Sequence, residues 1–218
     1  MTLPPEVHPG PLLALSQWLS PAFPTGAFAY SHGLEQVVAD GVVHDGATLE
    51  HWLRGVLRHG AGRQDGVVLA RALAPGADFE ALDTLARALA PSAERLGETL
   101  EQGAALARTV GHLGGRALPP RPLPVALGQA AAGLGLPVAV VLALYLQAFA
   151  SNLVIIATRH VPLGQSEGQA VLARLQPVIV DLAEGIARAG DPPIANAALA
   201  ADLAAMRHEV KEVRLFRT

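Results

Sequence analysis

Apolar residues recur along much of the chain at the spacing of amphipathic helices. The clearest stripe follows Asp45 at positions i, i+3, i+4, i+7 and i+8: Leu49, Trp52, Leu53, Val56 and Leu57. A stripe of this kind covers the side of a helix that faces the core. Asp45 stands where an N-cap residue is expected, so the pattern predicts a helix that begins just after it.

Similar stripes predict several more helices. One runs through residues 79–89 and ends before Pro91, whose ring and missing N–H cannot continue a helix. The next begins at Ser92 and continues to Gly114. Ser166 and Gln169 have the spacing of a capping box ahead of a further apolar run.

The last stripe predicts a helix over residues 196–207. Its large apolar side chains are expected to face inward: Leu199, Leu203 and Met206. No run alternates apolar and polar residues on either side of a hairpin turn, so strands are not expected. The proline-rich segment 114–124 is interpreted as a long connection inside one helical domain. The fold class predicted is all-α, a single domain over residues 1–218.

A long stretch without charge stands near the middle of the chain. From Pro122 to Thr158 there is no Asp, Glu, Lys or Arg. Residues 138–157 have about the 20 residues needed to cross a bilayer, so an α-helical membrane protein is one alternative. Polar residues inside the span and the absence of basic clusters at its ends favour a buried central helix of a bundle. Its small residues, such as Ala143 and Ala150, would let neighbouring helices or a second copy of the chain approach closely.

The composition and charge of the chain exclude some classes of protein and argue against others. Of the 218 residues, 51% are hydrophobic and only 16% are charged, which excludes a charge-rich disordered chain. A net charge of −3 argues against a nucleic-acid-binding protein, because such proteins carry a basic face. The chain has no cysteine, which excludes disulfides and thiolate sites and is compatible with a cytoplasmic location.

Catalytic and metal-binding motifs are not found. The only lysine is Lys211, and no phosphate-binding loop precedes it. The eight histidines show no spacing typical of a metal site. Residues 29–33 form a relaxed version of the turn that exposes a serine nucleophile, so a serine hydrolase using Ser31 is a second alternative. That motif requires a preceding strand, and a proline-rich loop precedes it here; a helix start near Ser31 is favoured.

Three segments together resemble the urease accessory protein UreF family. The first is Phe-Pro-Thr-Gly-Ala-Phe-Ala-Tyr-Ser-His-Gly-Leu-Glu at residues 23–35, and the second is Val-Pro-Leu-Gly-Gln at residues 161–165. The third is His208-Glu209 followed, after four residues, by Arg-Leu-Phe-Arg-Thr at residues 214–218. Their order and spacing make the combination specific, and the resemblance spans nearly the whole chain.

The resemblance implies an all-α protein that is not an enzyme and holds no catalytic residue, metal or cofactor of its own. Members of the family join a UreD-type accessory protein, also called UreH, and recruit the UreG-type GTPase. Together these proteins deliver nickel to apo-urease, so nickel and GTP would belong to the partner GTPase. The resemblance also implies a homodimer. From the net charge and the features of the apolar stretch, neither nucleic acid nor a membrane is expected as a partner.

The three segments supply the residues expected to bind partners. Arg159, the first charge after the apolar stretch, either caps a helix C-terminus or faces the GTPase. The tail places a phenylalanine and a leucine between arginines, which favours a segment that orders on a partner; residues 1–10 and 208–218 are therefore expected to be flexible when unbound. The expected partner-binding residues are Pro24, Gly26, Tyr30, His32, Glu35, Arg159, Gln165, Arg207, His208, Glu209, Arg214, Leu215, Phe216 and Arg217.

Overall fold

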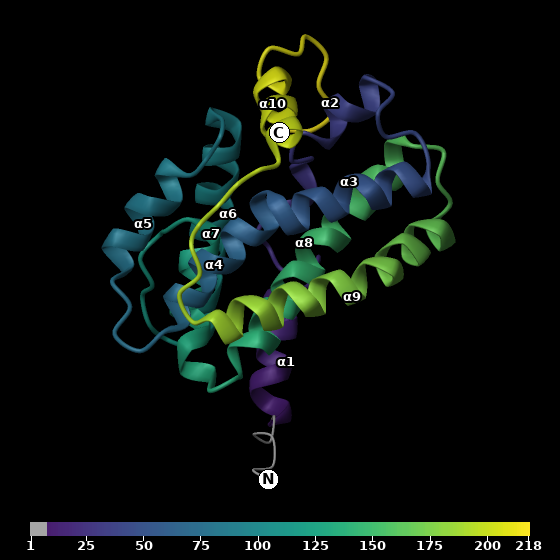
Figure 1. Cartoon of the computed structure of the whole chain (residues 1–218). Coiled ribbons are helices and arrows are strands. Elements are labelled where there is room, and N and C mark those ends of the chain that lie inside the picture. Colours follow the sequence, from purple (N-terminus) through teal and green to yellow (C-terminus); the bar gives the residue numbers. More distant parts are fainter. Residues whose placement is uncertain (1–7) are drawn as a thin grey trace.

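The computed structural model describes residues 8–218, and every regular element among them is helical, which confirms the all-α prediction (Figure 1). The first half of the chain forms α1 (Pro9–Trp18), η1 (Ala27–Ala29), α2 (Leu34–Ala39), α3 (Gly46–His59), α4 (Ala61–Leu73), α5 (Phe79–Ala88) and α6 (Ala93–Leu113). The second half forms α7 (Leu123–Ala131), η2 (Ala132–Leu134), α8 (Val138–His160), α9 (Gln165–Ala189) and α10 (Leu199–His208). The elements η1 and η2 are short 3-10 helices.

The uncharged stretch forms α8, around which the domain is built. It packs against α9, α4 and α3, and its fully buried side chains include Leu142, Leu146 and Ile156. Within residues 8–218 it is the one helix with the length and composition to cross a membrane. The prediction of a helix buried on all sides is wrong in one respect: a face that includes Leu144, Gln147 and Ser151 stays partly exposed. That face borders a hollow beside α1.

Side-chain caps set the starts of α3 and α6. The Asp45 carboxylate accepts a hydrogen bond from the Thr48 N–H at 2.8 Å, and the Thr48 hydroxyl accepts one from the Asp45 N–H, which completes a capping box. The Ser92 hydroxyl accepts the Arg95 N–H at the start of α6. The predicted capping box at Ser166 is wrong, because α9 already begins at Gln165 after Gly164.

Glycines let α7 lie directly against α6 and α4. A Cβ on Gly103 of α6 would lie 1.9 Å from the carbonyl oxygen of Arg121, in the segment that enters α7. A Cβ on Gly128 of α7 would lie 2.4 Å from the Cβ of Ala72 in α4. Because only hydrogen fits at these two positions, the connection over residues 114–122 can fold back onto α6.

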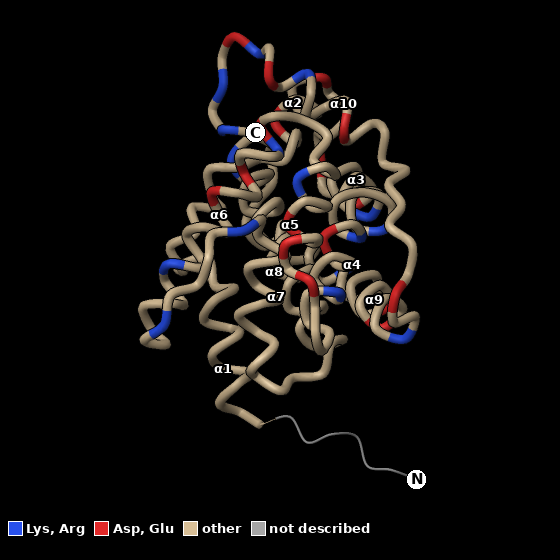
Figure 2. The backbone as a smooth tube through the Cα atoms, turned by 90° about the vertical axis from the view of Figure 1, so that its left-hand side faces the viewer, with Lys and Arg blue, Asp and Glu red and all other residues tan. Residues whose placement is uncertain are grey.

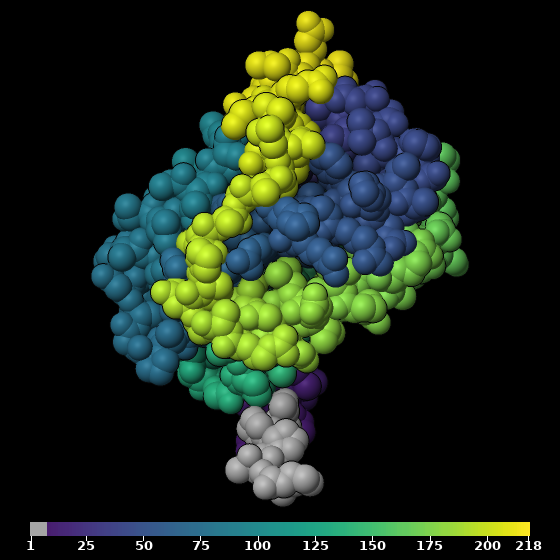
Figure 3. All heavy atoms as spheres, viewed as in Figure 1, coloured from purple at the N-terminus to yellow at the C-terminus, as the bar shows by residue number. Residues whose placement is uncertain are grey.

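An extended segment joins α9 to α10 across the outside of α3 and α4. In Figure 3 this segment, residues 190–198, crosses the face of the molecule as a yellow-green ridge. Arg71 of α4 pairs with Asp191 at 2.6 Å, and the Ala197 N–H donates to the carbonyl of His59 at 2.7 Å. This segment delivers α10 to the end of the molecule opposite α1 (Figure 1).

The helix α10 has the opposite orientation from the one predicted. Its buried residues are Ala204, Ala205 and His208. The large apolar side chains expected inside are exposed, by 67%, 47% and 44% respectively: Leu199, Leu203 and Met206. The small face is the buried one because α10 lies tightly on Gly33, where an added Cβ would come within 2.9 Å of the Ala205 nitrogen.

Candidate functional site

Two of the three motif segments meet at the end of the molecule formed by α2, α10 and the C-terminal residues (Figure 1). We call residues 209–218 the tail. The tail runs back from α10 and lies between the segment 29–35 and the first half of α6. Figure 2 shows charged residues crowded at this end, whereas α1 at the opposite end carries none.

Glu35 is the contact point between α2 and the tail. Its carboxylate accepts hydrogen bonds from the backbone N–H groups of Phe216 at 2.9 Å and Leu215 at 3.1 Å, and lies 3.2 Å from the His208 Nε2. Burial alone would raise the pKa of Glu35, but the N–H groups and His208 lower it below the ordinary value. The charged carboxylate therefore stabilises the docked tail.

His208 lies fully buried between two carboxylates. Its Nε2 faces Glu35, and its Nδ1 lies 2.7 Å from the Glu94 carboxylate at the start of α6. Glu94 also pairs with Arg214. The Glu209 carboxylate accepts the Glu94 N–H at 3.0 Å, so the tail caps the N-terminus of α6.

Tyr30, Glu101 and Arg217 form a second contact about two turns farther along α6. Arg217 pairs with the Glu101 carboxylate at 2.6 and 2.9 Å, and its guanidinium lies 5.3 Å from the centre of the Tyr30 ring. The Tyr30 hydroxyl donates to Glu101. Burial and the Glu101 charge raise the pKa of Tyr30, so the phenol stays protonated and remains a donor.

The last residue closes the tail against the segment 31–32. Thr218 is buried, its carbonyl oxygen accepts the Ser31 N–H at 2.9 Å, and its hydroxyl accepts the His32 N–H at 3.1 Å. The Ser31 hydroxyl also bonds to Thr218 and is buried. Ser31 follows no strand within the described residues, so it does not occupy the exposed turn of a serine hydrolase.

The tail is therefore packed on its own domain, with Phe216 in the main hydrophobic core. The flexibility expected of residues 208–218 when unbound stays a prediction. Three tail cations, Lys211, Arg214 and Arg217, meet the carboxylates of Glu35 on α2 and of Glu94 and Glu101 on α6. The Phe216 ring leaves water and stacks edge-on against His160, with ring centres 4.9 Å apart. Of the expected flexible segment 1–10, residues 1–7 lie outside the described part, and Pro9 and Gly10 belong to α1.

The second motif segment lies beside the tail without forming part of its ion pairs. His160, next to Arg159, makes the contact to Phe216, and Val161 is buried in the core. Arg159 lies in the last turn of α8 with an exposed side chain, and Gln165 is exposed at the start of α9.

The remaining expected partner-binding residues lie outside these contacts. Pro24 is exposed in the turn before η1, and Gly26 adopts a φ of 74°, which favours glycine there. Arg207 pairs with Asp40 after α2 at 2.7 Å.

The main residues of the site that the sequence reasoning missed are the carboxylates of α6. Glu94, Glu98 and Glu101 stand at i, i+4 and i+7, so they share one helix face. In the structure that face receives His208, Thr218 and Arg217 in turn. This spacing could have predicted the contact, because three carboxylates on one helix face are stabilised by cations or hydrogen-bond donors.

A large apolar surface lies next to the docked tail. It is formed by the outward face of α10 and by the exposed apolar residues of the tail, and we call it the α10 surface: Leu199, Leu203, Met206, Val210, Val213 and Leu215. Arg207 and Arg214, both largely solvent-exposed, stand beside it. Exposed apolar patches rimmed by charge are typical of protein-binding sites.

The polar side chains that meet at this site are engaged with one another. Among residues 8–218, no group of three or more His, Asp or Glu side chains is placed to hold a metal ion. The carboxylates that meet at the tail already have cationic or N–H partners. These hydrogen bonds and ion pairs hold the first motif segment, α6 and the tail together beside the α10 surface.

Comparison with known proteins agrees with the motif segments. The family model described as UreF matches residues 43–176. A urease accessory protein UreF from Cereibacter sphaeroides (strain KD131 / KCTC 12085) is 66% identical over 207 residues, which cover 95% of this chain and 98% of that protein. Proteins of the same name from Jannaschia sp. (strain CCS1) and Paracoccus denitrificans (strain Pd 1222) are 54% and 49% identical, covering 96% and 94% of this chain and 95% of each relative. The chain belongs to the UreF family of urease accessory proteins.

Proposed function

We propose that this chain is a non-catalytic cytoplasmic scaffold that joins a UreD/UreH-type accessory protein to a UreG-type GTPase. The assembled complex then inserts nickel into apo-urease in a GTP-dependent step. Nickel is the cargo and GTP the substrate of the partner GTPase, and this chain binds neither. The observation that carries the proposal is the α10 surface, because an exposed group of large apolar side chains is stabilised when a partner protein covers it.

The α10 surface is the proposed contact for the UreD/UreH-type protein. Leu199, Leu203 and Met206 lie at i, i+4 and i+7, so one groove on a partner would receive all three side chains. Val210, Val213 and Leu215 extend the surface along the tail. The docked tail holds these residues in position beforehand, which lowers the entropy lost on binding.

The groove between η1 and α6 is the proposed contact for the GTPase. Its lining joins Pro24, Gly26 and Tyr30 of the first motif segment to Arg108 of α6 and Arg217 of the tail. Phe28 stands in this groove with its ring 61% exposed. An exposed aromatic ring beside arginines is a common centre of a protein interface. The hollow between α1 and the exposed face of α8 is the surface proposed for a homodimer.

Co-purification with separately produced UreD/UreH-type and UreG-type partners tests this proposal. The double variant Leu203→Glu, Met206→Glu should lose capture of the UreD/UreH-type protein by at least tenfold, because two charges would have to be buried at the interface. Leu113→Glu is the matched control. It changes an equally exposed leucine at the far end of α6 and should bind both partners normally.

Phe28→Ala separates the two contacts. We expect it to weaken capture of the UreG-type GTPase while leaving the UreD/UreH-type protein bound. Circular dichroism should report unchanged helix content for all three proteins, since each change is on the surface. If the folded wild-type chain captures neither partner, the proposed scaffold role is wrong.

A further inference from the structure

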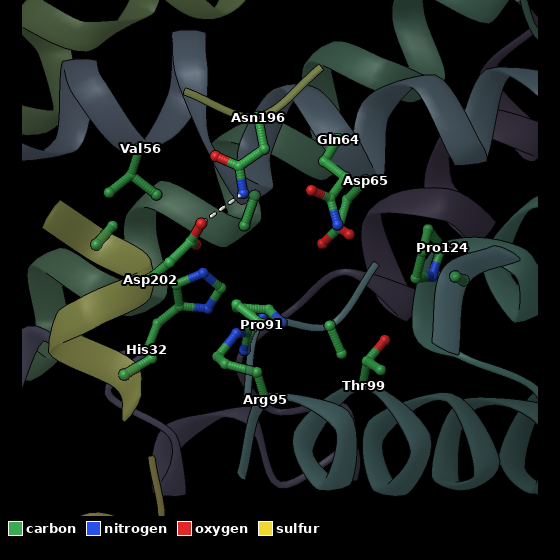
Figure 4. A pocket seen from close by; sticks show the side chains of 15 residues that line it. His32, Val56, Gln64, Asp65, Pro91, Arg95, Thr99, Pro124, Asn196 and Asp202 are labelled. Atoms are coloured by element: carbon green, nitrogen blue, oxygen red, sulfur yellow. Dashed lines mark hydrogen bonds between the residues drawn. The ribbon is translucent and has the colours of Figure 1, made fainter. Parts of the chain in front are cut away.

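A polar wall crosses the interior of the domain and separates two cavities. The larger one, of about 90 Å³, lies between α1, α6 and α8; we call it the α8 cavity. The smaller one, of about 30 Å³, lies toward α10. Four residues line both cavities: His32, Asp65, Arg95 and Thr99. Figure 4 shows all four side chains around the smaller cavity, with Asp202 beside His32.

Asp65 leaves the ionised side chains that line the α8 cavity, Asp65, Arg95 and Glu98, with a net negative charge. Among the described residues its carboxylate forms no ion pair, and its one hydrogen bond comes from the Tyr145 hydroxyl at 2.9 Å. The nearby Arg95 is paired with Glu98 on the same helix face, so these two charges cancel each other. A carboxylate has about four acceptor positions, and three of those of Asp65 remain unused.

Removal from water acts strongly on Asp65. Burial raises its pKa to about 6, although the Arg95 charge and the Tyr145 hydrogen bond oppose the shift. By contrast, the pKa of Glu98 falls to about 2, because Arg95 more than compensates for burial. The two carboxylates that line the α8 cavity therefore differ: Glu98 is ion-paired with Arg95, whereas Asp65 forms no ion pair among the described residues.

His32 adds an acceptor to the same wall. Burial and the Arg95 charge lower its pKa to about 4, so the imidazole is neutral at pH 7. Its Nδ1 lies 3.7 Å from Glu98 and has no hydrogen-bond partner among the described residues. The backbone of His32 has a φ of 59°, a conformation that non-glycine residues adopt at a cost. That conformation holds the ring in the wall, edge-on to Phe149.

Several hydrogen-bond acceptors line the α8 cavity, alongside donors such as Arg95 and Thr99. Gln102 donates its amide N–H to Glu98, and Asn152 donates its amide N–H to the carbonyl of Ala27. The carbonyl oxygens of these two amides remain as acceptors, together with Asp65 and His32. The aromatic rings of Trp18 and Phe149 also line this cavity, and such rings attract cations.

These features select one class of ligand. It must be small, carry one positive charge and donate several hydrogen bonds. A divalent metal does not fit, because no three metal-ligating side chains converge within residues 8–218. We propose that the α8 cavity binds a monovalent cation of the ammonium class, with Asp65 as its counter-ion. This site lies inside the domain, and its existence does not depend on the proposed scaffold role.

Ammonium chloride titration of the full chain at pH 7.5 tests the proposal. Sodium chloride and tetramethylammonium chloride at the same ionic strength serve as controls, since sodium donates no hydrogen bonds and tetramethylammonium has no N–H. We expect ammonium alone to raise Tm in a saturable way, by about 3 °C or more at ten times its dissociation constant. Equal effects of the three salts would mean that the cavity holds only water, and the proposal would fall.

Asp65→Asn tests the location of the site. It keeps an acceptor for Tyr145 and removes the charge, so the ammonium-specific shift should disappear. Asp181→Asn, at an exposed position on α9, should keep the shift. If the ammonium shift persists in folded Asp65→Asn, the assignment is wrong. A direct measurement needs no variant: bound ¹⁵N-ammonium should give a protected proton resonance with contacts to the Phe149 ring, and its absence at saturating ammonium would also overturn the site.

Discussion

At the residue scale, docking of the tail depends on a few carboxylates that have several donors each. Glu35 receives two backbone N–H groups and faces His208, while Glu101 receives Arg217 and the Tyr30 hydroxyl. Hydrogen bonds to a charged acceptor contribute more than those between neutral groups. The loss of one such carboxylate should therefore loosen the tail without disturbing the helices behind it.

Glu35→Gln is the sharpest test at this scale. The neutral amide keeps the shape but weakens two hydrogen bonds, and we expect the free energy of unfolding to fall by about 2 kcal/mol at pH 7. Limited proteolysis should cut the tail faster in this variant. Glu212→Gln, which changes an exposed glutamate within the tail, should behave like the wild type.

The same variant has a defined pH signature. Because the folded-state pKa of Glu35 lies below its ordinary value, its contribution is complete above that ordinary value, near 4.5, and is lost as the pH falls through the folded-state pKa. The difference in stability between the wild type and Glu35→Gln should therefore shrink as the pH is lowered below about 4.5. A difference that is constant from pH 7 to pH 3 would show that the carboxylate charge does not hold the tail.

At the scale of elements, close packing of helices rests on glycines at particular contacts. Gly103 and Gly97 both lie in α6, but only Gly103 faces the segment that enters α7. Around Gly97 an added Cβ would have no heavy atom within 4 Å. Two glycines of one helix are thus expected to respond in opposite ways to the same substitution.

Gly103→Ala should lower the free energy of unfolding by about 3 kcal/mol or more, because its Cβ would overlap backbone atoms that cannot move independently. Gly97→Ala should raise it by about 0.5–1 kcal/mol, since alanine is the better helix former and meets no obstacle. Urea denaturation of both variants measures the difference. Similar effects of the two substitutions would contradict the close approach of α6 and α7.

At the scale of the whole molecule, the C-terminal residues complete the core. Phe216 packs among buried residues from distant parts of the chain, and the Thr218 hydroxyl accepts a hydrogen bond from the His32 N–H. The adjacent Leu215 is 70% exposed and belongs to the α10 surface. One short tail therefore serves folding and the proposed partner contact through neighbouring side chains that point in opposite directions.

A pair of substitutions separates these two roles. Phe216→Ala should lower the free energy of unfolding by about 3 kcal/mol, the ordinary cost of removing a buried ring. Leu215→Ala should leave stability within about 0.5 kcal/mol of the wild type and weaken capture of the UreD/UreH-type partner instead. Thermal unfolding and co-purification give the two readouts. If both variants keep full stability, the tail is not part of the core.

Periodicity and caps were sufficient for most of the helices, and the three motif segments were sufficient for the family. The stripe after Asp45, the cap at Ser92 and the uncharged stretch each correspond to an observed helix, and the three motif segments led to the UreF family. These features are local: they depend on residues within a few turns of one another. The orientation of α10 was wrong for the same reason. The large apolar side chains of α10 face outward. Its own sequence does not show that the face with Ala204 and Ala205 packs on Gly33, which is far away in the chain.

The sequence by itself determined the helical class, the start of α3, the bounds of α5 and α6 and the absence of catalytic motifs, because side-chain size, caps and proline act on neighbouring residues. Only the tertiary structure decided that the tail lies on its own domain, that three glutamates of α6 contact residues 208–218, and that Asp65 lines a cavity without forming an ion pair among the described residues. Those arrangements join residues up to 187 positions apart. Their energies come from burial and charge pairing, which exist only after the helices have packed.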